Sequence, residues 1–269
     1  MASESNIQES ILTLNAKINI ARSVIQDVFD NFRKPAILWN ADKDSTALIH
    51  MIKEHQNDKS KKMYAIFIDH GLHHIETLKM IDEVSKSWNI KVFIVKNDDV
   101  VANFQKDGTV NVSKLNSENK TELINSGYGG ERLYFNPFSE VSRYLLLEIP
   151  LRKVVAKERF DCVFKGIRTD KVKNKNVREF IQRDKADLVL ARPMLTFNDI
   201  DVWNYTFKFH LPIHPLYYIG YRSVDGIDNS HPDKVHPVWE DILEYKERRF
   251  GVVKEENSVL QNLKQWGYL

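Results

Sequence analysis

Short, continuous apolar runs alternate along the chain with segments whose apolar residues recur every three or four positions. The continuous runs predict strands buried on both faces of a parallel sheet, and they lie at residues 36–39, 63–68, 91–95, 162–164, 188–191 and 193–195. The periodic segments predict helices with one apolar side, at residues 46–53, 74–88, 145–160 and 198–209. This alternation indicates an α/β fold with a doubly wound, mostly parallel sheet.

Helical periodicity also lies outside this alternating region. Apolar residues between 11 and 32 form a long helical stripe, which Pro35 terminates. We therefore expect one α/β domain over residues 1–235, with a helix at 8–33 packed on it. Residues 236–269 are expected to form a helical extension, after a segment rich in Pro, His, Tyr and Asp.

Composition narrows the class of protein. Apolar residues make up 42% and charged residues 28% of the 269 residues, which fits a chain with a sizeable core. Lys and Arg number 39 against 37 Asp and Glu, and this balance argues against a nucleic-acid binder. No signal peptide or membrane-spanning run is visible, so we expect a cytoplasmic protein without a membrane partner. The single cysteine, Cys162, lies in a predicted strand and allows no CxxC motif.

The polar loop at 39–45 is the first candidate site. It connects a buried strand to a helix, so backbone amides at the start of that helix can hold a phosphate. Lys43 adds a positive charge, while Ser45 and Thr46 offer hydroxyl groups. The alternative is a helix that Asp42 or Asp44 caps. Periodicity alone leaves both interpretations open.

The residues of this loop resemble a known motif. Ala36-Ile-Leu-Trp-Asn-Ala-Asp-Lys-Asp-Ser-Thr-Ala-Leu-Ile-His50 is similar to the SGGKDS loop of the N-type ATP pyrophosphatases, in the adenine nucleotide alpha hydrolase-like superfamily. The similarity is greatest to phosphoadenylylsulfate (PAPS) reductases, the small subunit of ATP sulfurylase and FAD synthetases. Ala41 and Asp42 replace the glycines of the motif, and Asp42 adds a negative charge where phosphate lies. The resemblance implies that the loop binds ATP or a related adenine nucleotide through Trp39, Asn40, Ala41, Asp42, Asp44, Ser45 and Thr46.

Asp69 ends the second predicted strand and resembles the carboxylate that closes the second strand in this family. The resemblance implies that Asp69, with Asp44, holds Mg²⁺. A carboxylate at this edge of the sheet suits such a role, or contact with a ribose hydroxyl. The alternatives are that Asp69 is only a turn residue, or that it binds a metal together with nearby histidines such as His70 and His73.

Further matches follow in the order that the family has them. Phe164-Lys-Gly-Ile-Arg-Thr-Asp170 resembles the family's Gly-[IATL]-Arg-x-[DE] segment, which implies that Gly166 and Arg168 contact phosphate or the second substrate. Residues 192–203 match a family stretch of Pro-Leu followed by Trp-x-x-x-Asp-[IV]-Trp, in which Phe197 replaces the first Trp. Residues 211–217 match the family's Pro-x-x-Pro-Leu-Tyr stretch. Gly220-Tyr-Arg-Ser223 resembles a segment of PAPS reductases and FAD synthetases, so Arg222 and Ser223 are expected to contact ligand. The resemblance extends from about residue 20 to 232.

Three reactions occur in the family that this chain resembles. PAPS reduction needs a cysteine near the C-terminus or an iron–sulfur cluster, and no cysteine follows Cys162. ATP sulfurylase and FAD synthetase chemistry need none, so we expect an adenylyltransferase that releases pyrophosphate, similar to the small subunit of ATP sulfurylase with sulfate as acceptor; the alternative is an FMN adenylyltransferase. Lys43, Arg168 and Asp69 are the expected catalytic residues, with Arg168 on the incoming oxyanion.

Other interpretations of the function, and the expected partners, also follow from the sequence. Because of Ala41 and Asp42, the chain is alternatively a nucleotide-binding or interaction protein without turnover. A role in tRNA modification is supported only by the basic segment 171–185, and the near-neutral net charge of the chain argues against it. The expected partners are the nucleotide, an anionic acceptor, and a partner subunit or a second copy of the chain.

Overall fold

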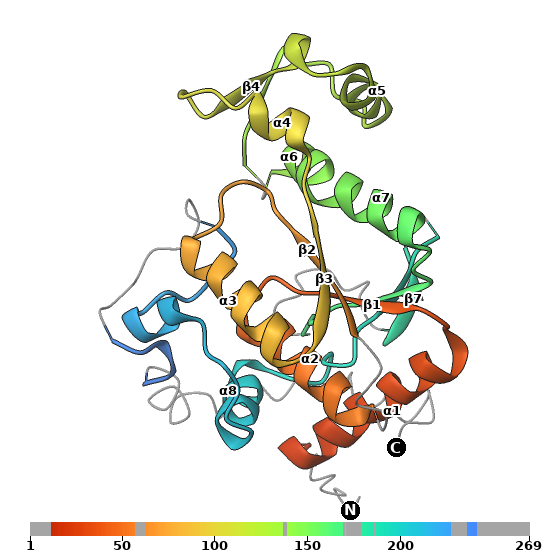
Figure 1. The fold of residues 1–269 in the computed structure, drawn as a ribbon, viewed down its shortest axis with the longest axis vertical. Helices are drawn as coiled ribbons and strands as arrows, with labels where there is room; N and C mark the ends of the chain where they lie inside the picture. The colour runs from red at the N-terminus through yellow and green to blue at the C-terminus, as the bar shows by residue number, and fades with distance from the viewer. Residues whose placement is uncertain are drawn as a thin grey trace, which may run out of the picture.

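A six-stranded sheet forms the centre of the molecule, with strand order β3-β2-β1-β6-β8-β7 (Figure 1). The computed structural model describes residues 12–56, 63–136, 139–168, 170, 179–184, 187–226 and 236–240. The strands are β1 Pro35–Leu38, β2 Met63–Ile68, β3 Ile90–Val95, β6 Cys162–Phe164, β7 Ile181–Arg183 and β8 Val189–Ala191. All neighbours pair in parallel except β7 and β8. The fold is thus α/β with a mostly parallel sheet, as predicted.

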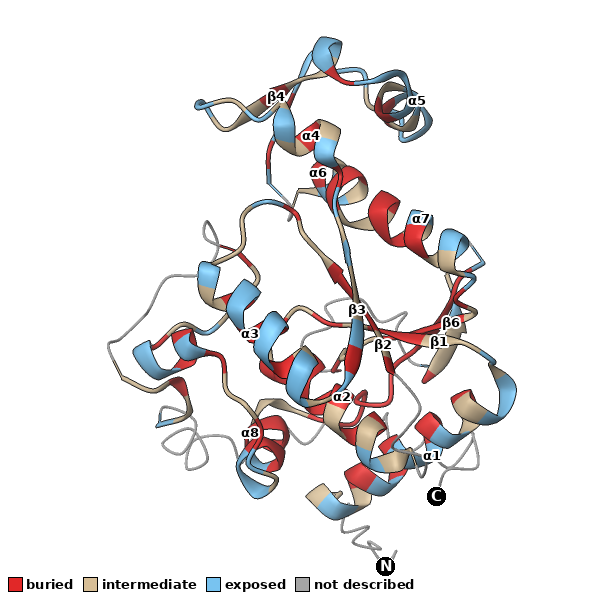
Figure 2. Cartoon of the chain, in the orientation of Figure 1, coloured by how far each residue is buried: buried red, intermediate tan, exposed pale blue. Residues whose placement is uncertain are grey.

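Helices cover both faces of this sheet. The first core packs one face against α1 Leu14–Asn31, α2 Lys43–His55, α3 Ile75–Ser87 and α8 Asp199–Lys208. A second core packs the other face against α7 Ile149–Glu158, mainly through Leu151 and Val154. Figure 2 shows the buried residues on the strands and on the helix sides that face them. Because helices lie on both faces, the sheet is doubly wound.

The N-terminal helix follows from local signals. The Thr13 side chain accepts a hydrogen bond from the Ala16 amide and caps α1, and the helix ends at Asn31, before Pro35. Buried residues such as Ile18, Val24 and Val28 form the predicted stripe. Residues 1–11 lie outside the described part of the chain, as do most residues of the expected extension at 236–269.

The segment between β3 and α7 has more structure than its sequence indicates. It contains α4 Asp98–Ala102, β4 Thr109–Asn111, η1 Val112–Lys114, α5 Ser117–Asn125 and β5 Arg132–Tyr134, and then α6 Glu140–Arg143 and a π-helical turn η2 Tyr144–Glu148. Strands β4 and β5 form a separate antiparallel pair over their own apolar core. These elements are short and polar, so they carry little periodicity.

Two expectations near the end of the sheet need correction. Residues 193–195 are a turn rather than a strand, because β8 ends at Ala191 and the Leu195 amide bonds to the carbonyl of Arg192. The basic segment includes strand β7, which pairs antiparallel with β8.

In the described residues, no helix is long and apolar enough to cross a membrane. A short 3₁₀ helix, η4 Pro215–Ile219, follows α8.

Candidate functional site

The loop at 39–42 joins β1 to α2 at the carboxyl edge of the sheet. Trp39 and Thr46 lie deeply buried against each other, and the indole Nε1 of Trp39 donates to Thr46 Oγ1 at 3.1 Å. Ala41 adopts a left-handed backbone with φ of 62°, a conformation that favours glycine. The loop therefore keeps the backbone course of a glycine-bearing turn, and Trp39 and Thr46 hold it in place.

Asp42 caps the helix that follows. Its Oδ1 accepts hydrogen bonds from the Ser45 amide at 2.7 Å and the Ser45 hydroxyl at 2.6 Å. Ser45 Oγ also lies 2.7 Å from Oδ1 of Asn40. The capping interpretation is thus confirmed for Asp42. A carboxylate of the chain itself occupies the position at the start of α2 where a phosphate is expected.

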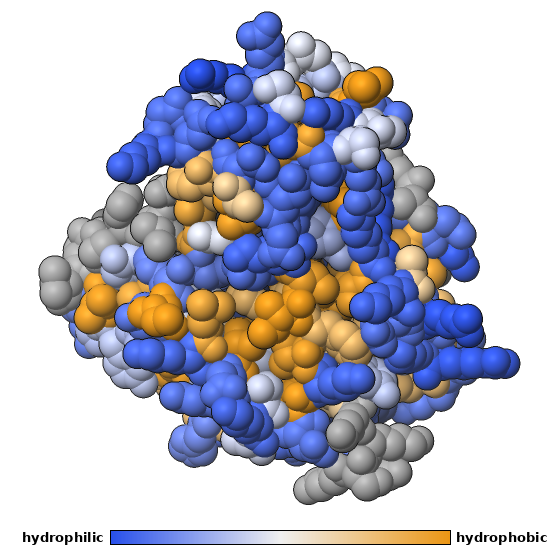
Figure 3. Space-filling view, turned by 45° about the horizontal axis from the view of Figure 1, so that its top comes forward, coloured by the Kyte–Doolittle hydropathy of each residue, from blue (hydrophilic) through white to orange (hydrophobic). Residues whose placement is uncertain are grey.

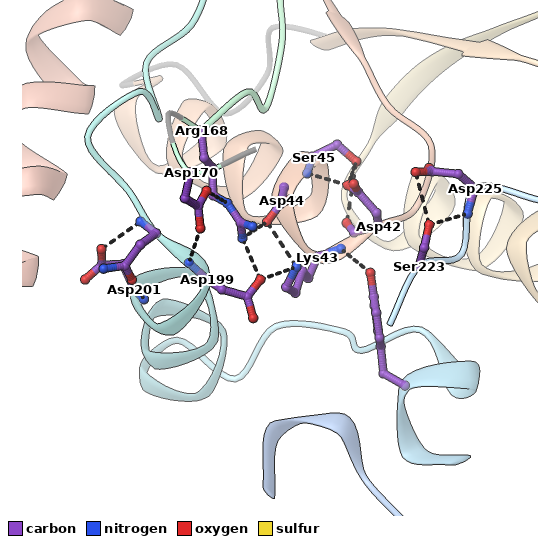
Figure 4. Close-up of polar contacts among 12 residues, drawn as sticks. Asp42, Lys43, Asp44, Ser45, Arg168, Asp170, Asp199, Asp201, Ser223 and Asp225 are labelled. Carbon is purple, nitrogen blue, oxygen red and sulfur yellow. Dashed lines mark hydrogen bonds and ion pairs between the residues drawn. The ribbon is translucent and has the colours of Figure 1, made fainter. Parts of the chain in front are cut away.

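Two basic residues from distant parts of the chain converge beside this turn (Figure 4). Lys43 Nζ and Arg168 Nη1 each lie 2.9 Å from the same oxygen, Oδ1 of Asp199. Arg168 Nη1 is also 2.8 Å from Asp44 Oδ1, and its Nε is 3.0 Å from Asp170 Oδ1. Lys43 thus comes from α2, Arg168 from the segment after β6, and Asp199 from the first turn of α8.

Burial and charge set the protonation of this network. Burial alone would lower the pKa of Arg168, but Asp44, Asp199 and Asp170 raise it above its usual value. Burial would likewise raise the pKa of Asp199, but the charges of Lys43 and Arg168 lower it below 3.8. Arg168 and Asp199 are therefore both charged at neutral pH, and one carboxylate oxygen of Asp199 is shared by two cations.

Close packing brings the Arg168 segment to the loop. A Cβ atom on Gly166 would lie 3.0 Å from the carbonyl carbon of Asp44 and 3.0 Å from the Ser45 amide. Any other residue at this position would push the segment away from α2. Gly166 therefore acts on the site by its lack of a side chain.

The segment at 220–226 also reaches the loop. Asp225 Oδ1 accepts a short hydrogen bond from Nδ2 of Asn40, and its Oδ2 accepts one from the Ser223 hydroxyl at 3.2 Å. Arg222 is exposed. Ser223 is thus connected to the loop through Asp225, which sequence reasoning did not single out.

Asp69 lies in a different ion pair. Its Oδ2 is 3.2 Å from Lys96 Nζ, and its Oδ1 accepts a hydrogen bond from the Gly71 amide at 2.8 Å. Asp44 is engaged by Arg168, so each carboxylate expected to hold Mg²⁺ already pairs with a cation. In the part of the chain that the structure describes, no three His, Cys, Asp or Glu residues are grouped to hold a metal ion. The residues present do not fit a magnesium site at Asp44 and Asp69.

The nearby histidines bond to the backbone. His70 Nε2 donates to the carbonyl of Asp225 at 2.9 Å, and its Nδ1 accepts from the Leu72 amide. Burial lowers the pKa of His70 to about 4, so the ring is neutral. His73 Nε2 lies 3.0 Å from the carbonyl oxygen of Ile68. These contacts give the histidines a structural role.

Asp199 is the main residue that sequence reasoning missed. Its place at the first turn of a predicted helix indicates a cap, but Asn198 is the cap residue and Asp201 completes the capping box. Asp201 Oδ2 also lies 2.7 Å from Lys17 Nζ. A capped helix with an extra acidic residue in its first turn is the one signal that marks Asp199 as available for another partner.

The chain is similar to known proteins over most of its length. The family model of the phosphoadenosine phosphosulfate reductase domain matches residues 34–232. The sulfate adenylyltransferase subunit 2 of Buchnera aphidicola subsp. Acyrthosiphon pisum is 22% identical over 228 residues, which cover 75% of this chain and 66% of that protein, just under two thirds. The subunit 2 of Bacteroides thetaiotaomicron is 25% identical over 84% of this chain and 76% of its own length.

Solved structures show the same fold. The Candida glabrata FMN adenylyltransferase in complex with FAD and inorganic pyrophosphate has a TM-score of 0.57 and 18% identity, over 95% of this chain and 80% of that one. The family match covers the strand, loop and helix at 35–55 and the segments that carry Arg168 and Asp199. The chain belongs to the phosphoadenosine phosphosulfate reductase domain family.

Proposed function

We propose that the chain is an adenylyltransferase that cleaves the bond between the α- and β-phosphates of ATP and releases pyrophosphate. The observation that carries this proposal is the position of Asp199 Oδ1, 2.9 Å from both Lys43 Nζ and Arg168 Nη1. One anionic oxygen between an ammonium and a guanidinium group marks the place for a phosphate oxygen. Lys43 and Arg168 are therefore assigned to the pyrophosphate.

The proposed chemistry needs positioning and charge rather than a covalent intermediate. An oxygen of the acceptor forms a bond to the α-phosphorus, and the bond from that phosphorus to the bridging oxygen breaks. The electron pair leaves with pyrophosphate, whose growing charge Lys43 and Arg168 stabilise. Asp199, whose side chain is 39% exposed, releases both cations as the phosphate arrives.

The acceptor is proposed to be sulfate, as the names of the relatives indicate for those proteins. FMN is the alternative acceptor. It is favoured by the hydrogen bond of Asn40 to Asp225, which attaches the segment resembling FAD synthetases to the loop. Purified protein with ATP and Mg²⁺ is expected to release pyrophosphate with only one of these acceptors.

A nucleotide-binding protein without turnover is the second candidate. Asp42 favours it, because its carboxylate holds both the amide and the hydroxyl of Ser45. Such a protein binds adenine nucleotides, and its melting temperature rises with ATP or AMP, while no acceptor yields pyrophosphate.

Calorimetric titration with ATP and Mg²⁺ tests whether the loop binds nucleotide. We expect saturable binding by the wild type and at least a tenfold weaker Kd for Lys43→Ala. Lys86→Ala is the matched control, because Lys86 is an exposed lysine of α3 that pairs with Asp82. A wild-type chain that binds no adenine nucleotide would overturn the proposal.

A partner subunit, or a second copy of this chain, is proposed as the macromolecular partner. The relatives are named as second subunits, and Figure 3 shows apolar residues gathered across the middle of one face. Large exposed apolar side chains include Ile94 of β3, which is 63% exposed, and Ile75 of α3. Light scattering of the purified chain gives its mass, and a monomer would favour a separate subunit.

A further inference from the structure

Two further basic residues, Lys165 and Arg192, follow neighbouring parallel strands at the same edge of the sheet. Phe164 of β6 pairs with Ala191 of β8, and the Lys165 amide donates to the carbonyl oxygen of Ala191 at 2.8 Å. Phe164 and Ala191 face the core under α1 and α2. Because side chains alternate along a strand, Lys165 and Arg192 lie side by side toward α7, on the other face.

Neither residue is hydrogen-bonded or ion-paired to a carboxylate of the described residues, although Asp184 raises the pKa of both. Arg192 is 6% exposed, and its Nη1 donates to two uncharged acceptors, the carbonyl oxygen of Glu179 at 3.3 Å and Gln182 Oε1 at 3.2 Å. Its Nε is buried with no acceptor in the described residues. In the same part of the chain, neither Lys165 nor Arg192 forms an ion pair. Buried positive charge without such compensation is costly.

The charges near Lys165 and Arg192 favour an anion between the two side chains. Burial lowers the pKa of Lys165, and the charges of Arg192 and Arg143 lower it further. Asp184 and Glu148 act in the opposite direction, but Glu148 pairs with Arg143, whose Nε is 3.9 Å from its Oε1. Burial also lowers the pKa of Arg192, while the charges of Glu179 and Asp184 raise it. An anion between Lys165 and Arg192 would offset the repulsion between them.

Lys165 and Arg192 also lie beside the loop at 39–42, which we propose binds the nucleotide. Gly166 follows Lys165 directly, and its Cα packs against the first turn of α2, where a Cβ would be 3.0 Å from the backbone of Asp44. The loop and the pair thus occupy two sides of one sheet edge. Groups bound at the two places would approach each other at that edge, where ligands of open α/β sheets bind.

We propose that Lys165 and Arg192 bind the acceptor of the adenylyl group, a tetrahedral oxyanion that is either free sulfate or a phosphate monoester. This assignment depends on the function proposed above. The two cations hold the oxygens that do not react, and a remaining oxygen attacks the α-phosphorus while pyrophosphate leaves toward Lys43 and Arg168. In this scheme Arg168, which pairs with Asp44, Asp170 and Asp199, is assigned to the pyrophosphate rather than to the acceptor.

Kinetics of pyrophosphate release test this assignment. With ATP saturating, Lys165→Met and Arg192→Met are each expected to raise the KM for the acceptor at least tenfold, with the Kd for ATP unchanged within twofold. Lys165→Arg keeps the charge and is expected to restore most of the affinity. Lys153→Met is the matched control, because Lys153 is an exposed lysine of α7 paired with Glu118. Sulfate and FMN are assayed in parallel, and the one whose KM rises identifies the source of the oxyanion.

Binding of the anion alone provides a second readout. Sodium sulfate or sodium phosphate, compared with sodium chloride at equal ionic strength, is expected to raise the melting temperature of the wild type but not of Lys165→Met. An acceptor KM and an anion-dependent melting shift that are both unchanged in Lys165→Met would overturn the assignment, even if ATP binds through Lys43. If ATP does not bind but the anion shift depends on Lys165, the adenylyltransferase proposal fails and the anion site stands.

Discussion

Two pairs of basic residues lie at the carboxyl edge of the same sheet, and they differ in how their charge is compensated. Lys43 and Arg168 share Asp199, and Arg168 also pairs with Asp44 and Asp170 (Figure 4). Lys165 and Arg192, on the other face, have no carboxylate partner in the described residues.

The burial of a cation and its availability for a ligand are therefore separate properties. The Lys43–Arg168 pair is held in place by carboxylates, so its geometry is set before a ligand arrives, and a phosphate must displace Asp199. The Lys165–Arg192 pair carries uncompensated charge and gains most from an anion. Without a ligand, carboxylates thus hold Lys43 and Arg168 in position, whereas no carboxylate of the described residues pairs with Lys165 or Arg192.

The largest expected effect is on stability, from removal of Arg168. Arg168→Met removes the guanidinium group that lies 2.8 Å from Asp44, a carboxylate only 2% exposed, and leaves it the more distant Lys43 Nζ at 3.4 Å. We expect a loss of about 3–5 kcal/mol in the free energy of unfolding, measured by urea denaturation. Arg192→Met is the comparison, and we expect a loss of no more than about 1 kcal/mol, because its acceptors are uncharged. Equal losses in the two variants would contradict the distinction between the pairs.

Removal of the uncompensated charge at Lys165 is expected to stabilise the protein. Lys165→Met should raise the free energy of unfolding at pH 7 by about 1 kcal/mol. The pKa of Lys165 is lowered in the folded state, so its unfavourable contribution is complete below that pKa and is lost as pH rises toward 10.5. The advantage of the variant should therefore shrink between pH 7 and 10. A variant less stable than the wild type would show that the ammonium group is compensated.

Asp199 contributes a smaller, pH-dependent amount. Its pKa is lowered in the folded state, so its stabilising effect is present above pH 3.8 and is lost as pH falls below that value. Because its side chain is 39% exposed, we expect Asp199→Asn to cost about 1 kcal/mol or less at pH 7. Denaturation curves of the variant and wild type should converge at low pH. The same variant should bind ATP more tightly, since it competes less for Lys43 and Arg168.

The smallest effect on stability is expected at Asp42. Glycine is an acceptable cap, so Asp42→Gly should cost only a few tenths of a kcal/mol. It removes a negative charge and frees the amide of Ser45, so ATP should bind several-fold more tightly than to the wild type in calorimetry. If the affinity for ATP does not change, Asp42 leaves its position on ligand binding.

The agreement between sequence and structure depends on the kind of element. Strands such as Met63–Ile68 and Cys162–Phe164 were predicted with the observed bounds, because both faces are buried and the apolar run is continuous. The helix stripes followed equally from periodicity. Strand β7 was missed, because Ile181–Arg183 is a short edge strand that pairing with β8 alone stabilises. The small elements from α4 to α6 were also missed, since they are short and pack on a local core of their own, whereas η2 falls within the helix predicted at 145–160.

The sequence alone was sufficient to predict the α/β class, the order of its main elements, and a loop at 39–45 that carries Lys43 at the start of a helix. It also placed Arg168 after a strand that ends at the same edge. Which charges meet could not be predicted in this way, because Asp199 is 31 residues from Arg168 and its partners depend on how α8 packs. The same holds for Lys165 and Arg192, which strand pairing brings together. Local spacing specifies elements, whereas the electrostatics of a site depend on distances between elements far apart in the chain.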